Sequence, residues 1–388
     1  MKCFRIIVLL FLLLHTTVFA QTDSCRLRIS LLTCSPGAEL YSTFGHTAIR
    51  VTDSTRGVDM VFNYGTFDDR DPAFLFNFTK GLMRYSLSGY SYQEFLAEYQ
   101  SEQRGVIEQL LSLNCSEKQQ LFAALSENAR GENRYYNYYF HTDNCTTRAR
   151  DMIVQKTGAS IVFKNILPEK IPSFRNLIHT YLDKGGQGWS KLGIDFLLGA
   201  NLDKKATNEE AMFLPDYLMM GVNKATNAGR PLESQRQSVL APTLSPSFPL
   251  ISPLLLFAAL FTIVGLLSFS AGKTAQRIIN VFDCVFFLLV GVLGLVIVTL
   301  WAIRIDTVCR SNFNLWWALP THFFVAFVVY FKRNWLQQYF RFVFILTLLF
   351  AVCCWFLPQQ FNTAVYPIVA IILLRSYFRG NVRNMRKK

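Results

Sequence analysis

Phe44-Gly45-His46-Thr47-Ala48-Ile49-Arg50 is the stretch that decides the fold, because it predicts a β-strand that opens on a histidine just after a glycine. A glycine has no side chain to cover its neighbour, so the imidazole can project from the edge of a sheet. Apolar residues at 27–32 and 60–64 predict a strand before and a strand after this one. The polar residues 53–57 predict a hairpin turn between the histidine strand and the strand at 60–64. Together these segments predict a small antiparallel sheet.

Three helices are expected to follow, because apolar residues recur three and four positions apart at 92–102, 116–128 and 146–156. Ser116 and Gln119 have the spacing of a capping box at the start of the second helix. The expected fold class is therefore α+β, with the sheet packed against helices.

The N-terminus has the pattern of a secretory signal. The chain of 388 residues is 51% apolar and only 17% charged, and the apolar excess gathers at its two ends. Residues 1–20 place Lys2 and Arg5 ahead of an apolar run that finishes Val18-Phe19-Ala20, which predicts a cleavable signal peptide and a mature start near Gln21. An uncleaved anchor is the alternative, although the run is short for a span of about 20 residues.

Residues 249–379 predict a transmembrane helical domain, because apolar blocks alternate there with short polar breaks. Five blocks count as spans, and the last requires Arg375 to extend its charge toward the membrane surface. Their bounds are 249–270, 278–303, 315–331, 342–357 and 364–378. Residues 204–248 lose periodicity and end in prolines, so they are expected to connect this domain to an exported catalytic domain at 21–203.

The distribution of Lys and Arg predicts the orientation, since cytoplasmic loops carry an excess of these residues. With the N-terminal domain outside, the basic loops and the basic tail at 380–388 all face the cytoplasm. Five spans give this result, whereas four would leave the tail outside. The residues concerned are Lys273, Arg277, Lys332, Arg333, Arg341, Arg379, Arg383, Arg386, Lys387 and Lys388. Much of the net charge of +13 lies in these positions, so it does not indicate nucleic-acid binding.

Four of the nine cysteines, Cys25, Cys34, Cys115 and Cys145, lie in the expected exported domain. An oxidising compartment favours disulfides there. The simplest expectation is that the four cysteines form two disulfides. In a three-plus-one division of the cysteines, one thiol would remain free.

Asp143-Asn144-Cys145-Thr146-Thr147-Arg148 places one of these thiols in the first turn of the third expected helix. The helix dipole and the unpaired backbone N–H groups favour a thiolate at that place, and the same N–H groups can hold an oxyanion. The alternative is an inert buried cysteine or half of a disulfide, which is the commoner outcome for a cysteine taken alone.

A thiol at a helix start beside a histidine on a strand is the arrangement that nucleophilic acyl chemistry needs. Cys145 would be the nucleophile and His46 the general base. Asn63 is expected to orient the imidazole, because a four-residue hairpin loop puts it on the same face of the sheet as His46. Glu39 and Asp143 are the alternatives for this third role.

Other candidate residues carry weaker signals. His141 would lie in the loop before the helix, and His179 has only a structural interpretation. Tyr138 and Tyr139 belong to an aromatic run at 135–140 that could line an acyl chain or rest at a bilayer surface, although core packing explains such runs more often. The sequence has no metal-ligand spacing and no glycine-rich phosphate loop, so no metal or cofactor is expected.

The order of His46 before Cys145 is reversed relative to ordinary papain-like enzymes and resembles the circularly permuted papain-like group, which includes NlpC/P60 and lecithin retinol acyltransferase-like thiol enzymes. A closer resemblance, over most of residues 25–235, is to the Lnb family of bacterial lipoprotein N-acyltransferases. Its motifs here are Cys34-Ser35-Pro36-Gly37, Glu39-Leu40-Tyr41-Ser42, Phe44-Gly45-His46-Thr47-Ala48-Ile49-Arg50, Phe62-Asn63-Tyr64-Gly65-Thr66-Phe67 and Asp143-Asn144-Cys145-Thr146-Thr147-Arg148.

The resemblance implies an acyltransferase that moves an acyl chain from a phospholipid, through a thioester on Cys145, to the α-amino group of a diacylglyceryl-cysteine lipoprotein. It places the chain in the bacterial inner (cytoplasmic) membrane as a multi-pass protein, with the catalytic domain on the periplasmic side. One alternative is a membrane-anchored cysteine hydrolase acting on cell-wall peptide or lipid. The other is a non-enzymatic envelope scaffold, in which Cys145 forms a disulfide with Cys25, Cys34 or Cys115.

Overall fold

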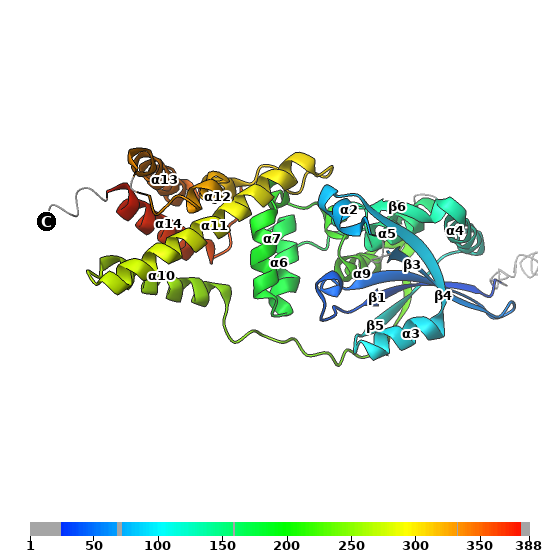
Figure 1. Ribbon diagram of the computed structural model, residues 1–388. Coiled ribbons are helices and arrows are strands. Elements are labelled where there is room, and N and C mark those ends of the chain that lie inside the picture. The colour runs from blue at the N-terminus through cyan, green and yellow to red at the C-terminus, as the bar shows by residue number, and fades with distance from the viewer. Residues whose placement is uncertain (1–24, 68–71, 158–159, 332, 382–388) are drawn as a thin grey trace, which may run out of the picture.

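The computed structural model describes residues 25–67, 72–157, 160–331 and 333–381. A sheet-plus-helix domain lies at one end of the molecule and a bundle of helices at the other, with two short helices between them (Figure 1). The predicted signal peptide and most of the predicted basic tail lie outside the described residues.

A seven-stranded antiparallel sheet forms the N-terminal domain, with strand order β10-β5-β1-β2-β3-β4-β6. The strands are β1 Leu27–Cys34, β2 His46–Asp53, β3 Val58–Thr66, β4 Met83–Ser91, β5 Val106–Leu111, β6 Tyr135–Tyr138 and β10 Glu233–Leu240. The three strands expected from the sequence are β1, β2 and β3, and they pair in chain order. The sheet is larger than expected, because four strands with weaker alternation extend both of its edges.

Helices cover both faces of this sheet. Alternate residues of β1 point to opposite faces, so Leu32 packs under α3 (Tyr92–Ser101) while Leu31 belongs to the larger core on the other face. That second face carries α4 (Cys115–Asn128), α5 (Cys145–Lys156) and α9 (Pro215–Lys224). The expected α+β sheet with helices is therefore present.

The three expected helices correspond to α3, α4 and α5, each within one residue of its expected bounds. The capping box of α4 was placed wrongly: Asn114 and Glu117 form it, rather than Ser116 and Gln119. The Asn114 side chain accepts from the Glu117 N–H at 2.9 Å.

The segment 204–248, expected to be a connection, is instead folded onto the sheet domain. It contains α8 (Asn208–Ala211), α9 and the edge strand β10, together with β8 (Thr226–Asn227) and β9 (Arg230–Pro231), which pair with β7 (Ile161–Val162). β10 has polar side chains on both faces because it lies at an exposed edge, and so it lacks the alternation that identifies a strand. The irregular connection covers only 241–252.

The C-terminal region is helical. Its helices are α10 Pro253–Phe269, α11 Lys273–Ile303, α12 Thr321–Ala326, α13 Asn334–Cys353 and α14 Val365–Gly380. Among the described residues, α11 and α13 are long and apolar enough to cross a membrane, and α10 is a shorter apolar helix. The third expected span, 315–331, is not one helix but a 3₁₀ turn, η4 (Phe313–Trp316), followed after Pro320 by the six-residue α12. The count of five spans is therefore not confirmed.

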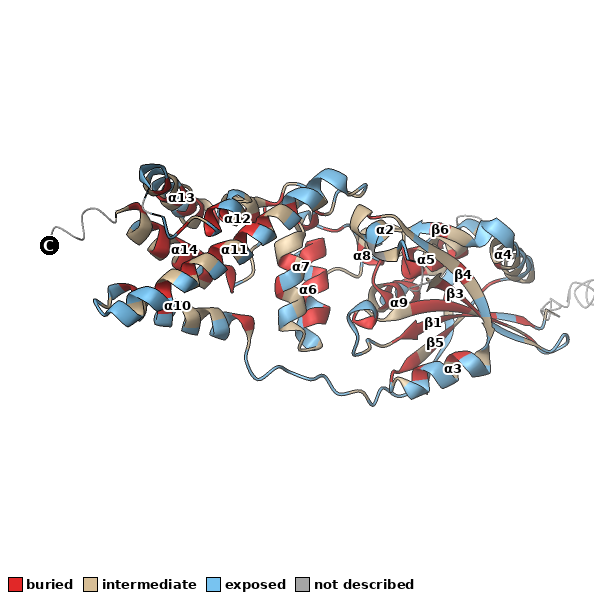
Figure 2. Cartoon of the chain, in the orientation of Figure 1, coloured by how far each residue is buried: buried red, intermediate tan, exposed pale blue. Residues whose placement is uncertain are grey.

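Many large apolar side chains of α10, α11 and α13 are exposed, as the pale blue stretches in Figure 2 show. Such wide apolar faces are typical of surfaces that contact lipid rather than water. Arg375, expected to reach toward the membrane surface, is instead buried in the bundle, where its Nε lies 2.7 Å from Oδ1 of Asp283. Arg379 binds the same carboxylate and Ser268 accepts from Arg375, so paired charges join α10, α11 and α14.

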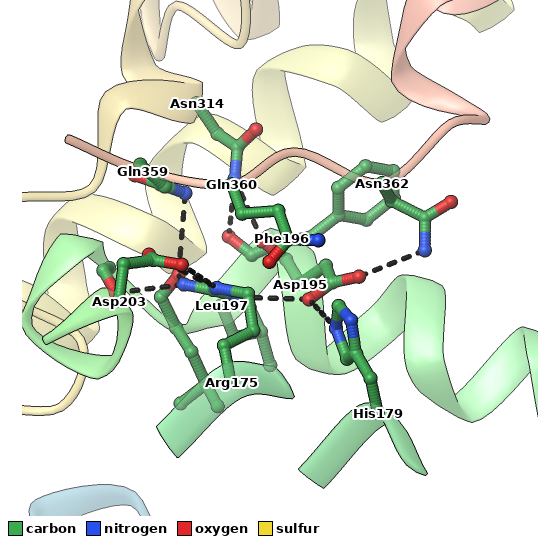
Figure 3. A network of polar contacts seen from close by, with 12 residues as sticks. Arg175, His179, Asp195, Phe196, Leu197, Asp203, Asn314, Gln359, Gln360 and Asn362 are labelled. Atoms are coloured by element: carbon green, nitrogen blue, oxygen red, sulfur yellow. Dashed lines mark hydrogen bonds and ion pairs between the residues drawn. The ribbon is translucent and has the colours of Figure 1, made fainter. Parts of the chain in front are cut away.

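The two short helices between the domains are α6 (Phe174–Lys184) and α7 (Gly188–Leu197), followed by the 3₁₀ turn η3 (Ala200–Asp203). Figure 3 shows the polar contacts that tie them to the C-terminal helices. We call Arg175, His179, Asp195, Asp203, Asn314, Gln359 and Asn362 the docking network.

Asp195 lies at the centre of the docking network. Its Oδ1 is 2.9 Å from Nη1 of Arg175 and 2.7 Å from Nε2 of His179, and its Oδ2 accepts from Asn362 at 2.9 Å. The side chains of Asp195 and Arg175 are each only 1% exposed. The ion pair joins α6 to α7, and the hydrogen bond from Asn362, in the loop before α14, joins α7 to the bundle.

Candidate active site

His46 is held at the start of β2 by the glycine before it. Gly45 has φ of +76°, and a Cβ on it would lie 2.6 Å from the backbone oxygen of Cys34. Only glycine fits such a position without displacing the backbone of β1. His46 pairs across the ladder with Cys34, with its ring at the end of the strand.

Cys145 is the first residue of α5, as the sequence predicts. The side chain of Asn144 caps the helix, since its Oδ1 accepts from the N–H groups of Thr146 and Thr147 at 2.9 Å each. The Asn144 amide also donates to the backbone oxygens of Phe140 and Phe213. The thiol therefore lies at a helix N-terminus that is anchored from two sides.

The helix start and the histidine strand are joined directly. The hydroxyls of Thr47 and Thr146, both fully buried, lie 3.1 Å apart. The His46 imidazole and the Thr47 N–H lie close enough to the Cys145 thiol to lower its pKa. The expected nucleophile and base are therefore in contact.

Asn63 is the residue that hydrogen-bonds the imidazole. Nε2 of His46 donates to Oδ1 of Asn63, which leaves Nδ1 as the ring nitrogen for the thiol. The β2–β3 register, with a four-residue loop, puts Asn63 diagonally across from His46, as expected. Asn63 is in turn fixed by Tyr90, whose hydroxyl accepts from Nδ2 at 3.3 Å.

The two alternatives for the third role lie elsewhere. Glu39 precedes the 3₁₀ turn η1 (Leu40–Ser42) with an exposed side chain. The Asp143 carboxylate binds Arg148 through both oxygens, at 2.6 and 2.7 Å. Among the described residues, therefore, the imidazole is paired with Asn63 and Cys145.

Gly65 provides the space between the thiol and the imidazole. It lies at a bulge between β3 and β4 with φ of +111°. A Cβ there would be 3.4 Å from Cε1 of His46 and 3.5 Å from Cβ of Cys145. Any larger side chain would enter the gap between the two groups.

Gly65→Val should therefore strongly lower any activity that depends on the thiol and the imidazole, because it adds both a strained φ, costing about 1–3 kcal/mol, and methyl groups between the two groups. Comparing turnover of this variant with that of Gly57→Val tests the claim. Gly57 also has a positive φ, of +63°, but nothing lies within 4 Å of its added Cβ. Equal losses in both variants would mean that backbone strain alone, and not the gap, is responsible.

The electrostatics of the pair favour an ionised thiol. Burial raises the pKa of Cys145, but the charge of His46 and the hydrogen bonds from His46, Thr47 and Thr146 outweigh it and lower the pKa from 9.0 to about 7. Burial likewise lowers the pKa of His46, yet the neighbouring thiolate and Asn63 raise it above its usual value. Both shifts favour a thiolate–imidazolium pair near neutral pH.

Alkylation of Cys145 by iodoacetamide should rise with pH around a midpoint near 7, because the thiolate is the reactive form. In His46→Ala the midpoint should move upward, since burial then acts without the opposing imidazolium. Peptide mass spectrometry across a pH series gives both midpoints. A wild-type midpoint at 9 or above would contradict the lowered pKa.

The four cysteines of the sheet domain divide into one disulfide and two thiols. Cys25 and Cys115 are bonded, whereas Cys34 and Cys145 are free and buried. Two disulfides were expected, so that expectation was wrong, and the scaffold in which Cys145 is disulfide-bonded is excluded with it. Burial raises the pKa of Cys34 to about 12, which leaves that thiol inert.

The candidate substrate-binding residues, Tyr138 and Tyr139, have different contacts. The Tyr138 ring stacks on Tyr85 with centroids 4.3 Å apart, and both rings lie against the core that contains Cys145. Tyr139 pairs through its backbone with Asp143. His141 packs edge-on against Phe174, away from the thiol pair, with its Nδ1 unbonded among the described residues.

The sequence did not indicate the roles of Thr47, Gly65 and Tyr90 or the double role of Asn144. Gly65 gave a usable signal, since an isolated glycine inside a strand indicates a bulge or a close approach. Tyr90 gave none, because it lies on β4, which was not predicted. Among the described residues no group of three or more His, Cys, Asp or Glu side chains could hold a metal ion.

Two family matches agree with this arrangement. Residues 16–179 match the Lnb N-terminal periplasmic domain, and residues 245–387 match the Lnb transmembrane domain. No curated protein and no solved structure matches the chain significantly. Together the two matches cover both the domain that holds the thiol pair and the apolar helices.

Proposed function

We propose that this member of the Lnb family, a membrane protein with a periplasmic N-terminal domain, is a lipoprotein N-acyltransferase. The acyl chain would pass from a phospholipid, through a thioester on Cys145, to the α-amino group of a diacylglyceryl-cysteine lipoprotein. The observation that carries the proposal is the buried, free thiol at the start of α5, which faces His46 across Gly65 and has a pKa lowered to about 7.

In the first half of the reaction, the Cys145 thiolate attacks the ester carbonyl of the phospholipid. The backbone N–H of Cys145, at the positive end of the helix dipole, is the donor that we assign to the oxyanion. When the tetrahedral intermediate collapses, the ester C–O bond breaks and the His46 imidazolium gives its proton to the departing lysophospholipid oxygen. The products are an acyl thioester and a neutral imidazole.

In the second half, the α-amino group of the lipoprotein attacks the thioester carbonyl. His46 accepts the proton that the nitrogen loses, the C–S bond breaks, and the thiolate–imidazolium pair is restored. Asn63 would keep the ring in position throughout, because it holds Nε2 while Nδ1 exchanges the proton.

We further propose that the sheet domain is a circularly permuted papain-like fold, supported by the histidine on β2, the asparagine on β3 and the later cysteine at the start of α5. The chain would be a multi-pass protein of the inner membrane with this domain outside. Its signal peptide would end near Ala20, and its membrane domain of five spans would follow the connection at 241–252. The broken third block would then cross the bilayer as a discontinuous element.

Purified full-length protein, phospholipid vesicles and a diacylated lipopeptide test the function. The lipopeptide should gain the mass of one amide-linked acyl chain. Release of free fatty acid without transfer would select the cysteine hydrolase instead, and an unchanged peptide with folded protein would overturn acyl transfer.

A further inference from the structure

A short aromatic helix, α2 (Phe74–Lys80), lies beside the outer end of α11 (Figure 1). Its last residue, Lys80, accepts through its backbone oxygen from the N–H of Ile305 at 3.0 Å, and the Phe78 backbone oxygen accepts from Arg304 at 3.0 Å. α11 ends at Ile303, so these bonds are made to the first residues beyond the apolar helix. α2 therefore has a fixed height relative to the end of that helix.

That height corresponds to the lipid headgroups. Arg304 and Asp306 are the first charged residues after the long apolar run of α11, and they form an ion pair with each other. Charged residues at the end of a spanning helix mark the polar boundary of the bilayer. When α11 spans a bilayer, the exposed side chains of α2 therefore lie level with this boundary.

The exposed side chains of α2 suit that place. Phe76 is 61% exposed and Phe78 47%, although both are large and apolar. The Lys80 ammonium lies 4.1 Å from the centre of the Phe76 ring, where it can remain among headgroups above inserted rings. Aromatic and basic residues together are typical of helices that lie in a membrane surface.

A continuous line of rings leads from α2 toward the thiol. We call Phe78, Phe74, Phe67, Tyr85 and Tyr138 the aromatic strip. Successive ring centroids are 6.3, 5.8, 5.0 and 4.3 Å apart. All five side chains retain some exposure, and the strip ends at Tyr138, which packs against the core that includes Cys145.

We propose that α2 is seated in the outer leaflet of the bilayer, and that the aromatic strip is the path along which a phospholipid acyl chain reaches Cys145. The path rests on the proposed acyl transfer, whereas the seat does not. We choose the bilayer as the contact surface because α2 is bonded to the end of α11, which is long and apolar enough to cross a membrane and exposes large apolar side chains.

Photolabelling of the full-length wild-type protein tests both parts. The probe is a phospholipid with a diazirine on its acyl chain close to the ester, carried in vesicles of phosphatidylethanolamine and phosphatidylglycerol. Peptides of α2 should be labelled as strongly as those of the lipid-facing α13, and the β4 peptide with Tyr85 should also carry label. Peptides of α4, at the end of the molecule far from the bundle (Figure 1), should remain at background.

If α2 carries no more label than α4, the proposed position of α2 in the outer leaflet is wrong. Label on α2 without label at Tyr85 would overturn the path. If the wild type transfers no acyl chain at all, the proposed function fails, and with it the path, while the α2 label still decides the seat.

A pair of variants gives a second readout. Phe76→Glu should slow transfer from vesicle phospholipid several-fold, because it places a charge in the seat. Val162→Glu is the matched control, since Val162 is also 61% exposed but belongs to β7, outside the aromatic strip. When the wild type does transfer acyl chains, an equal rate in Phe76→Glu would overturn the seat.

Discussion

Cells carrying Cys145→Ala should contain lipoproteins without the amide-linked acyl chain, because the variant has no atom on which a thioester can form. His46→Ala should lower the transfer rate by about 10²–10⁴-fold, the usual contribution of a general acid–base residue. The remaining rate would come from the helix N-terminus and from substrate binding, which the variant leaves in place. Mass spectrometry of lipoprotein N-terminal peptides measures both effects.

Cys34→Ala is the matched control for the thiol. Cys34 is also free and buried in the same domain, but burial raises its pKa to about 12, so it should not react at neutral pH. Lipoproteins from this variant should keep the acyl chain. An amide-linked chain retained in Cys145→Ala cells would remove the covalent mechanism.

Asp195→Ala should destabilise the protein by about 3–5 kcal/mol, because removing one partner of a buried ion pair leaves the other charge uncompensated. Arg175 would keep one carboxylate, Asp203, but lose its contact with Asp195, and His179 would lose the acceptor of its Nε2. The helices α6 and α7 should then separate more readily from the bundle, because the bond to Asn362 is lost as well. Thermal unfolding of the detergent-solubilised protein, followed with probes in each domain, measures the loss.

Asp183→Ala is the control on the same pair of helices. Its ion pair with Lys191 is largely exposed, with Asp183 59% accessible, so its loss should cost at most about 1 kcal/mol. Similar losses in the two variants would show that the docking network does not hold the domains together.

The stabilisation by Asp195 depends on pH. Burial raises the pKa of Asp195, but His179, Arg175 and Asn362 together lower it below its usual value. The stabilisation is therefore present above the ordinary carboxyl pKa and lost as pH falls through the lowered one.

The sequence predicted the thiol pair because each member lies in a strongly patterned segment. His46 opens an apolar strand after a glycine, and Cys145 opens a helix behind an Asn cap, so local rules placed both. Asn63 followed from the hairpin, since a four-residue loop fixes the register between two strands. Features that depend on residues close together in the sequence, such as a helix cap or a hairpin register, can therefore be predicted from the sequence pattern.

What the sequence did not predict depends on contacts between distant segments. β10 is a strand only because β5 offers an unpaired edge, and its polar residues carry no alternation. Arg375 has a buried partner only because α11 brings Asp283 beside it, a pairing that hydropathy does not indicate. The third apolar block satisfies hydropathy but is broken near Pro320, because composition does not determine where a helix ends.

The most direct test of a Cys145 thioester is the mass of the Cys145 peptide after incubation with phospholipid vesicles and no lipoprotein. Covalent transfer predicts one acyl chain on Cys145, removed by neutral hydroxylamine and passed to a diacylated lipopeptide added afterwards. An unmodified Cys145 peptide, from protein that acylates the lipopeptide when both substrates are present, would contradict it.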